Sequence, residues 1–298
     1  MAIPVILDTD IGSDIDDTWA LAMLMRCPEL DLKMVLTETA DTTYRAALTA
    51  KFLTVAGRDD VPIAVGLPGK PGGEFQAPWL GEYTLDRYPG PVHADGVRAF
   101  IDLVEGSPEP VTVIAIAPPP SLSRALEIAP HIAENCRFAG MFGSIDRGYG
   151  TGSAPIAETN VRVDVSAAKR VLGAPWRNAV ITPLDTCDDA ILSGELYRSL
   201  LDSADPLIRA VFENYRVWAE LVTWVTVDFL DERSSTLFDT VAVYLAYSRS
   251  LLQVERMRLS VTDEGGTVRD PNGHPLDVAM RWRDLEAFKA HLVERLLG

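Results

Sequence analysis

Along the first two thirds of the chain, short runs of apolar and often β-branched residues alternate with longer segments in which apolar residues recur at i, i+3 and i+4. The short runs predict strands and the longer segments predict helices. The strands are expected at residues 3–7, 32–37, 62–65, 111–117, 137–142 and 179–181, and the helices at 17–26, 43–56, 95–104, 122–128 and 166–171. Because the strand runs are almost continuously hydrophobic, helices should cover both faces of the sheet. The pattern therefore predicts an α/β fold with an open, mostly parallel sheet.

The pattern changes after about residue 190. Two long helices are predicted at 205–223 and 236–247, followed by alternating strands at 254–261 and 267–270 and a last helix at 282–297. The turn residues 263–266 predict a small β-hairpin between the two strands. No change in composition marks a linker, so residues 1–298 are expected to form one domain with a helical C-terminal part. The glycine- and proline-rich segment 66–91 is long enough to be a functional loop.

Composition and charge narrow the choice of partner. The chain has 298 residues with 43 acidic and 27 basic side chains, a net charge of −16 that argues against nucleic acid or an anionic membrane. No apolar run approaches the roughly 20 residues that span a bilayer. The first residues have no signal-peptide pattern, and the three cysteines have no zinc spacing. These features predict a cytoplasmic protein that acts on a small molecule.

The strongest local feature is a group of five aspartates within residues 8–17, between the first strand and the first helix. Asp8 and Asp10 should lie on the same side of the strand end, and Asp16 and Asp17 should lie in the first helical turn. Several converging carboxylates repel each other unless a cation lies among them, and Ca²⁺ accepts six to eight oxygen ligands. The alternative is that single aspartates cap the helix and interact with its dipole. The EF-hand spacing is excluded because Gly12 stands where that motif needs an oxygen ligand.

A phosphatase of the haloacid dehalogenase type also begins with Asp-x-Asp after its first strand. In that interpretation Asp8 would be the nucleophile, and Asp188 and Asp189 would imitate the later acidic pair. Such enzymes usually have Thr or Val four residues after the nucleophile, where this chain has Gly12. The phosphatase hypothesis is weakened by this difference but stays open.

The motifs together resemble the inosine–uridine-preferring nucleoside hydrolase family. The N-terminal DTDIGSDIDDTWALA resembles the family signature DxDPGxDDAxA with a two-residue insertion. Further matches follow in the family's order along nearly the whole chain. They are TETAD at 37–41, VHADG at 92–96, AETN at 157–160 with VD at 163–164 and AA at 167–168, LDT at 184–186 and LFDT at 237–240. Because these matches follow the same order as in the family, we do not expect the resemblance to arise by chance.

The resemblance implies a role for each matched residue. It makes Asp10 the general base and a Ca²⁺ ligand, and Asp17, Asp239 and the backbone carbonyl of Ile116 the other protein ligands. The residues that it implies for binding the ribose hydroxyls are Asp16, Glu158 and Asn160, with Asp41 at the border of the same pocket.

The implied activity is Ca²⁺-dependent hydrolysis of the N-glycosidic bond of a ribonucleoside or related N-riboside, giving inverted ribose and the free base. The chemistry suits these residue types, because the reaction needs an activated water and stabilises positive charge on the sugar. The resemblance also implies a Rossmann-like sheet, a homodimer or homotetramer, and a place in purine or pyrimidine salvage.

Two departures from the family pattern bear on catalysis. Prolines occupy 118–120, where the family has a turn with backbone donors, and Phe238 stands where many members have a histidine that is a candidate acid for the leaving base. These two departures leave open the hypothesis that the protein is a ribose-binding homologue with impaired catalysis. His93 is the only histidine in a matched segment, so it is the best remaining candidate acid. Trp218 and Trp224 could stack on a base, but their positions on the long helix favour core packing for each.

The basic residues of the predicted helices show no grouping along the sequence. Arg45, Lys51, Arg124 and Lys169 lie far apart and match no motif, so they are expected to be solvated.

Overall fold

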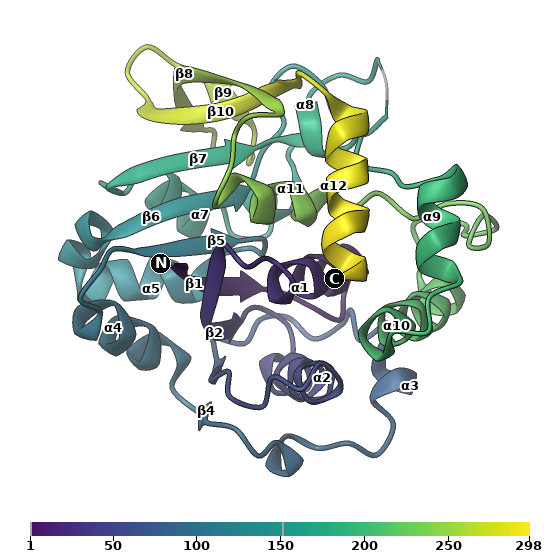
Figure 1. Cartoon of the computed structure of the whole chain (residues 1–298). Coiled ribbons are helices and arrows are strands. Elements are labelled where there is room, and N and C mark those ends of the chain that lie inside the picture. The colour runs from purple at the N-terminus through teal and green to yellow at the C-terminus, as the bar shows by residue number, and fades with distance from the viewer. Residues whose placement is uncertain (1, 151) are drawn as a thin grey trace.

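A ten-stranded sheet forms the centre of the computed structural model, which describes residues 2–150 and 152–298 (Figure 1). The strand order is β4-β3-β2-β1-β5-β6-β7-β10-β8-β9, and every neighbouring pair is parallel except those that involve β8. The strands are β1 Ile3–Thr9, β2 Leu30–Thr37, β3 Ile63–Val65, β4 Val92–His93, β5 Val111–Ala115, β6 Cys136–Met141, β7 Asn178–Thr182, β8 Leu252–Val261, β9 Thr267–Arg269 and β10 His274–Trp282. The predicted α/β class is confirmed.

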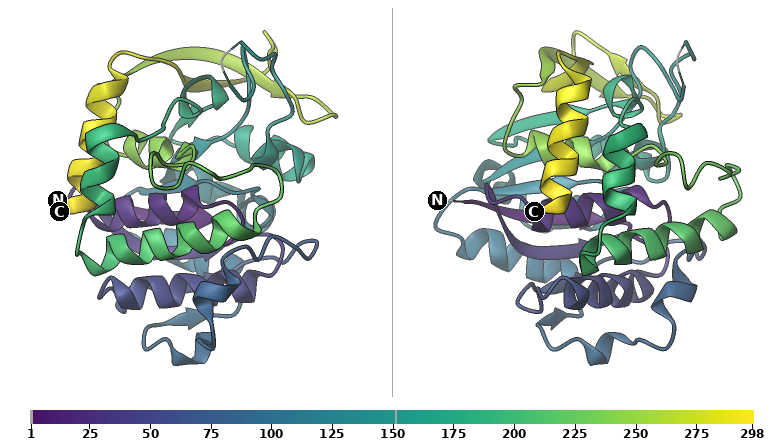
Figure 2. Two further views of the ribbon diagram at one scale, coloured as in Figure 1. Left: turned by 90° about the vertical axis from the view of Figure 1, so that its right-hand side faces the viewer. Right: turned by 45° about the vertical axis from the view of Figure 1, so that its right-hand side comes forward.

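Helices cover both faces of this sheet, as Figures 1 and 2 show. One face carries α1 Asp16–Met25, α2 Thr42–Val55, α8 Leu184–Cys187, α9 Gly194–Leu201, α10 Pro206–Leu221, α11 Phe238–Leu245 and α12 Leu285–Leu297. The other carries α4 Gly96–Gly106, α5 Pro120–Ile128, η2 Pro130–Asn135 and α7 Val165–Leu172. Alternate residues of β1 enter the two cores: Val5 and Leu7 pack into one and Ile6 into the other. This alternation explains why the strand is apolar throughout.

The C-terminal part contains one strand, β10, and one helix, α9, that the sequence did not predict. The hairpin of β8 and β9 is confirmed, with Gly265 at a φ of 84° in its turn. The sequence analysis missed β10, and the helix expected from Trp282 begins at Leu285 because Trp282 ends this strand. β10 lies between β7 and β8, and this long-range pairing leaves no mark on local periodicity.

The connections between elements also contain short helices. Segment 66–91 contains α3 Ala77–Leu80 and η1 Leu85–Arg87, and α6 Thr159–Arg162 follows the loop after β6. No helix among the described residues is long and apolar enough to cross a membrane.

The strand order creates one switch point at β1. The chain builds outward from β1 through β2, β3 and β4, and then returns to place β5 on the other side of β1. In open α/β sheets the ligand crevice lies at such a point, beyond the carboxyl ends of the strands. The aspartate-rich loop directly follows β1, so it lies at this point of the sheet.

Candidate active site

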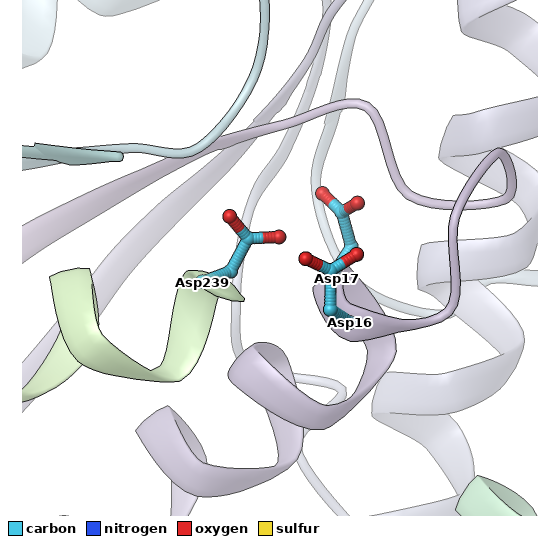
Figure 3. Close-up of side chains that lie close together, drawn as sticks. All are labelled: Asp16, Asp17 and Asp239. Carbon is cyan, nitrogen blue, oxygen red and sulfur yellow. The ribbon is translucent and has the colours of Figure 1, made fainter. Parts of the chain in front are cut away.

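Three carboxylates from distant parts of the chain meet beyond the end of β1. Asp16 and Asp17 occupy the first turn of α1, and Asp239 occupies the first turn of α11. Each offers an oxygen within 4.8 Å of the others, and all three side chains are buried (Figure 3). Two helix N-termini therefore bring into one group the acids that the sequence places more than 200 residues apart.

The three acids lie in an environment that disfavours their charge. Burial and then the charge of Asp14 raise the pKa of Asp16, while burial and the charges of Asp10 and Asp16 raise that of Asp17. Burial and the charges of Asp16 and Asp17 also raise the pKa of Asp239. Within the described part of the chain, none of the three forms an ion pair with Lys or Arg. An oxygen-only, cation-free set of this kind fits a hard divalent cation.

Asp10 lies in the same loop and is the most accessible of the predicted metal ligands. Its side chain is 19% exposed, and its carboxylate lies 3.6 Å from the guanidinium of Arg45. Burial raises the pKa of Asp10, and the positive charge of Arg45 opposes that rise. The charge of Asp10 in turn raises the pKa of Asp17.

The expectation that Arg45 is solvated is wrong. Its side chain is buried in α2 and donates hydrogen bonds to the backbone carbonyls of Asp10, Ile11 and Thr39 and to Oγ of Ser13. These bonds fix the loop that carries the aspartates against the end of β2. A lone arginine in a helical pattern gave no sign of this role, because the acceptors are carbonyls of another segment.

Replacing Arg45 with Met should destabilise the protein by about 3 kcal/mol, since three backbone carbonyls lose a buried donor. Urea unfolding followed by circular dichroism measures this change. The exposed Arg124 on α5 provides the matched control, and Arg124→Met should stay within about 0.5 kcal/mol of the parent. Equal effects of the two substitutions would show that the Arg45 contacts contribute nothing to the stability of the loop.

Glu158 and Asn160 lie at the start of α6. The Glu158 carboxylate accepts hydrogen bonds from the backbone N–H groups of Gly143, Asn160 and Val161. Burial raises its pKa to about 7 despite these three donors. Asn160 Nδ2 donates to the carbonyls of Ile116 at 3.3 Å and Met141 at 3.0 Å, which leaves Oδ1 for a ligand. Asn160 therefore joins the end of β5, where the predicted carbonyl ligand lies, to the acidic site.

Two other predicted residues form no hydrogen bond with the acidic group within the described part of the chain. The exposed Asp41 caps α2 and accepts hydrogen bonds from the backbone N–H groups of Thr43 and Tyr44. His93 is exposed on β4, the edge strand, and β3 and β2 separate it from β1. The structure thus does not place His93 beside the aspartates.

The predicted aromatic residues belong to two separate clusters. Trp218 is buried and its Nε1 donates to the carbonyl of Ser13 at 3.1 Å, so it packs on the aspartate loop. The exposed Trp224 contacts Trp218 edge-on, and Phe75 contacts Trp224, with ring centroids 6.3 and 5.2 Å apart. Core packing thus accounts for Trp218, while Trp224 has an exposed face.

The second cluster pairs Phe238, next to Asp239, with Tyr149 at a centroid distance of 5.8 Å. Burial and then the charge of Glu158 raise the pKa of Tyr149, whose ring contacts Phe238 beside Asp239. The sequence analysis missed Tyr149 and Phe75, because both lie in loops that match no motif.

The proline loop after β5 is held by one residue that the motifs did not identify. Ser121, directly after Pro118–Pro120, donates from its N–H and its hydroxyl to the buried carboxylate of Glu38, at 2.9 and 2.6 Å. Glu38 follows β2, so the loop is tied to the strand on the far side of β1. A single serine therefore supplies donors that the prolines cannot.

The position of Asp8 argues against the phosphatase hypothesis. Its side chain is fully buried at the end of β1, where burial and the charge of Glu38 raise its pKa. A nucleophile for a phosphate ester must be accessible and ionised. Asp8 is inaccessible because it is fully buried, and its raised pKa disfavours the ionised form.

A buried acidic group at the switch point of an open α/β sheet indicates a ligand site that can hold a cation. Residues 5–290 match the model of the inosine-uridine preferring nucleoside hydrolase family, and the chain belongs to this family. It is a hydrolase that acts on N-glycosyl bonds, and the predicted resemblance is confirmed.

Named relatives agree with this assignment. The chain is 33% identical over 235 residues to the non-specific ribonucleoside hydrolase RihC of Escherichia coli O1:K1, covering 72% of this chain and 73% of the relative. It is 30% identical over 234 residues to the pyrimidine-specific ribonucleoside hydrolase RihA of Citrobacter koseri, covering 72% and 70%. The plant nucleoside hydrolase PpNRh1 shares the fold with a TM-score of 0.81, 22% identity and full coverage of both chains.

Proposed function

We propose that this hydrolase cleaves the N-glycosidic bond of a ribonucleoside or related N-riboside in a Ca²⁺-dependent reaction, giving ribose and the free base. The observation that carries the proposal is the group of three buried carboxylates, none of which forms an ion pair with a Lys or Arg side chain of the described residues. Family membership supports the reaction class. The identity of the ion rests on the oxygen-only donor set, because Ca²⁺ accepts more carboxylate ligands than Mg²⁺.

The ligands in this proposal are Asp10, Asp17, Asp239 and the carbonyl of Ile116. When bound, the cation would lower the pKa of a water molecule and offset the repulsion among the carboxylates. Asp10 is suited to accept the proton from water, since it is the most accessible of the proposed carboxylate ligands and Arg45 holds its backbone. The remaining negative charge favours the positive charge that develops on the sugar.

The sugar is held by Asp16, Glu158 and Asn160 in this proposal, with Asp41 at the border of the pocket. Glu158 keeps its orientation through three backbone donors, and Asn160 presents Oδ1 because its amide nitrogen is already used. Fixed polar groups of this kind recognise a hydroxyl pattern with little reorganisation. The arrangement supports specificity for ribose ahead of specificity for the base.

The base is proposed to lie near Phe238 and Trp224, with Trp218 supporting the loop. Trp224 has an exposed ring face, and Phe238 is half-buried next to Asp239. Aromatic faces of this kind can stack on a purine or pyrimidine. We also propose a cytoplasmic homodimer or homotetramer acting in nucleoside salvage without nucleic-acid or membrane partners, which light scattering and fractionation would test.

A panel of nucleosides and N-ribosides tests the proposed function directly. Release of reducing sugar and of free base should be stoichiometric and should need no phosphate. Ribose binding without hydrolysis of any riboside would identify a binding protein with impaired catalysis instead. Release of phosphate from sugar phosphates would restore the phosphatase hypothesis.

Ribosides should be preferred over 2′-deoxyribosides by about 100-fold in kcat/KM. Without the hydroxyl, Asp16 and Asn160 lose partners at roughly 1–3 kcal/mol for each buried group. Inosine and 2′-deoxyinosine are compared by base release. Equal specificity constants would contradict recognition through the sugar, and Asn160→Ala should narrow the difference if Asn160 binds this hydroxyl.

Protonation of the leaving base should depend on Tyr149 more than on His93. Phe238 has no proton to give, Tyr149 contacts Phe238, and His93 lies on the edge strand. Tyr149→Phe should lower kcat on inosine by about 100-fold and should hardly affect p-nitrophenyl riboside, whose leaving group needs no acid. His93→Ala should leave the ratio of the two rates unchanged. The reverse result would assign the acid to His93, as the sequence predicted.

A further inference from the structure

A cavity of about 260 Å³ lies at the end of the sheet opposite the acidic site. Its lining includes Thr112, Arg137 and Asn178, at or near the starts of β5, β6 and β7, and residues 245–249 at the end of α11. We propose that this cavity binds the phosphate group of a small ligand, either inorganic phosphate or a phosphate monoester.

The three strand residues form a polar row. Thr112 pairs in register with Arg137, and Arg137 pairs with Asn178, so the three side chains lie on the same face of three adjacent strands. Two residues further along each strand, the same face carries Ile114, Ala139 and Val180, which belong to the apolar core. The cavity therefore has apolar lining at Ala139 and Val180 and polar lining at the strand starts.

Thr112 supplies the observation that points to a ligand. It is 2% exposed, and its hydroxyl has no hydrogen-bond partner in residues 2–150 and 152–298. Buried hydroxyl groups in proteins nearly always have a partner, because the loss of water is otherwise uncompensated. An oxygen of a molecule in the cavity would provide that partner.

The charge around the cavity favours an anion. Arg137 donates to the carbonyl of Pro110 at 3.2 Å and forms no ion pair within the described residues, so most of its guanidinium donors are available. Arg249 and Arg256 share one acid, Asp277. This part of the surface is therefore locally positive in a chain whose net charge is −16. Arginine binds phosphate oxygens through paired donors.

The end of α11 selects among anions. Its last carbonyls carry partial negative charge and therefore disfavour an anion that has no proton to donate. Phosphate that keeps a proton, or a monoester with sugar hydroxyls, has donors for that side and acceptors for Arg137 and Thr112. Chloride has no donor, and a fully ionised carboxylate has none either.

This site is separate from the catalytic one. Asp239 lies in the first turn of α11 and the cavity at the last, a span of about 12 Å for eight residues. Thr112 and Arg137 can therefore be changed without touching any residue placed in the hydrolytic site.

Isothermal titration calorimetry with inorganic phosphate and with glycerol 3-phosphate, a monoester without ribose, tests the proposal at constant ionic strength and with chloride as reference. We expect one phosphate-dependent site in the whole protein. Affinity should fall at least about tenfold in Thr112→Val and in Arg137→Gln. Arg281→Gln, which removes the same charge from an exposed strand position outside the cavity, should bind as the parent does.

A second measurement guards against simple loss of folding. Thr112→Val removes an unpartnered hydroxyl, so its Tm without phosphate should equal or exceed that of the parent, and the rise in Tm on adding phosphate should disappear. Preference for one probe identifies the source of the phosphate group. Absence of binding by the parent protein, or equal affinity in all three variants, would overturn the proposal.

Discussion

Chelation with EGTA should abolish ribose release, and Ca²⁺ should restore it more effectively than Mg²⁺. The proposed ligands combine carboxylates with one backbone carbonyl, a donor set without nitrogen or sulfur. Ca²⁺ accommodates six to eight oxygens in flexible geometry, whereas Mg²⁺ demands a smaller, near-octahedral site. EGTA discriminates between these ions, so its effect identifies the ion as well as the dependence.

Removal of the cation should also change how the stability of the protein depends on pH. Without a cation, burial and mutual repulsion raise the pKa values of Asp16, Asp17 and Asp239 above those in the unfolded chain. The folded protein then holds more protons than the unfolded one, so stability is present at low pH and is lost as pH rises through the raised pKa values. The metal-free protein should therefore have a higher Tm at pH 5 than at pH 8. Bound Ca²⁺ should reduce or reverse this difference.

Two variants separate loss of the ion from loss of the fold. Asp239→Asn should need more Ca²⁺ for half-maximal activity, because one anionic ligand becomes neutral. Asp146→Asn, at an exposed residue that pairs with Arg269, should respond to Ca²⁺ as the parent does. Full activity in EGTA, with no metal detected by elemental analysis, would exclude a cation from the reaction.

The sheet was predictable because its strands are buried on both faces and therefore show as apolar runs. β1 and β5 are examples: both are buried by helices that the 3.6-residue period also marks. β10 was not predicted, because it is a strand through pairing with β7 and β8. These strands are distant in sequence, and such pairing leaves no local pattern. The prediction therefore succeeded for elements that are defined by local burial.

The acidic residues of the site were predictable for a different reason. Five aspartates in ten residues are visible in the sequence, and the match around Asp239 suggested its partner. Arg45 and Tyr149 had no such signal, because each acts through contacts with the backbone or ring of a distant segment. Residues that support a catalytic loop are identified by their partners, and the partners require the fold.

Asp10→Asn should lower kcat by about 1,000-fold while the protein stays folded. The substitution keeps an oxygen for the cation but removes the group proposed to accept the proton from water. Stability should not fall, because burial already raises the pKa of Asp10 and so disfavours its charge. A neutral amide at this position also relieves the repulsion that Asp17 experiences.

The measurements that decide this case are kcat, KM, Tm and bound metal for the same preparations. If Asp10 is the base, Asp10→Asn should have a lower kcat with nearly unchanged KM and metal content. Its pH profile of kcat/KM should also lose the acidic limb. A residue that only binds the ion predicts instead that excess Ca²⁺ restores kcat. Asp102→Asn, at an exposed position of α4, provides the matched control and should change none of these quantities. Near-normal turnover in Asp10→Asn would move the role of the base to another residue of the acidic group, since Asp10 would then be dispensable for activating water.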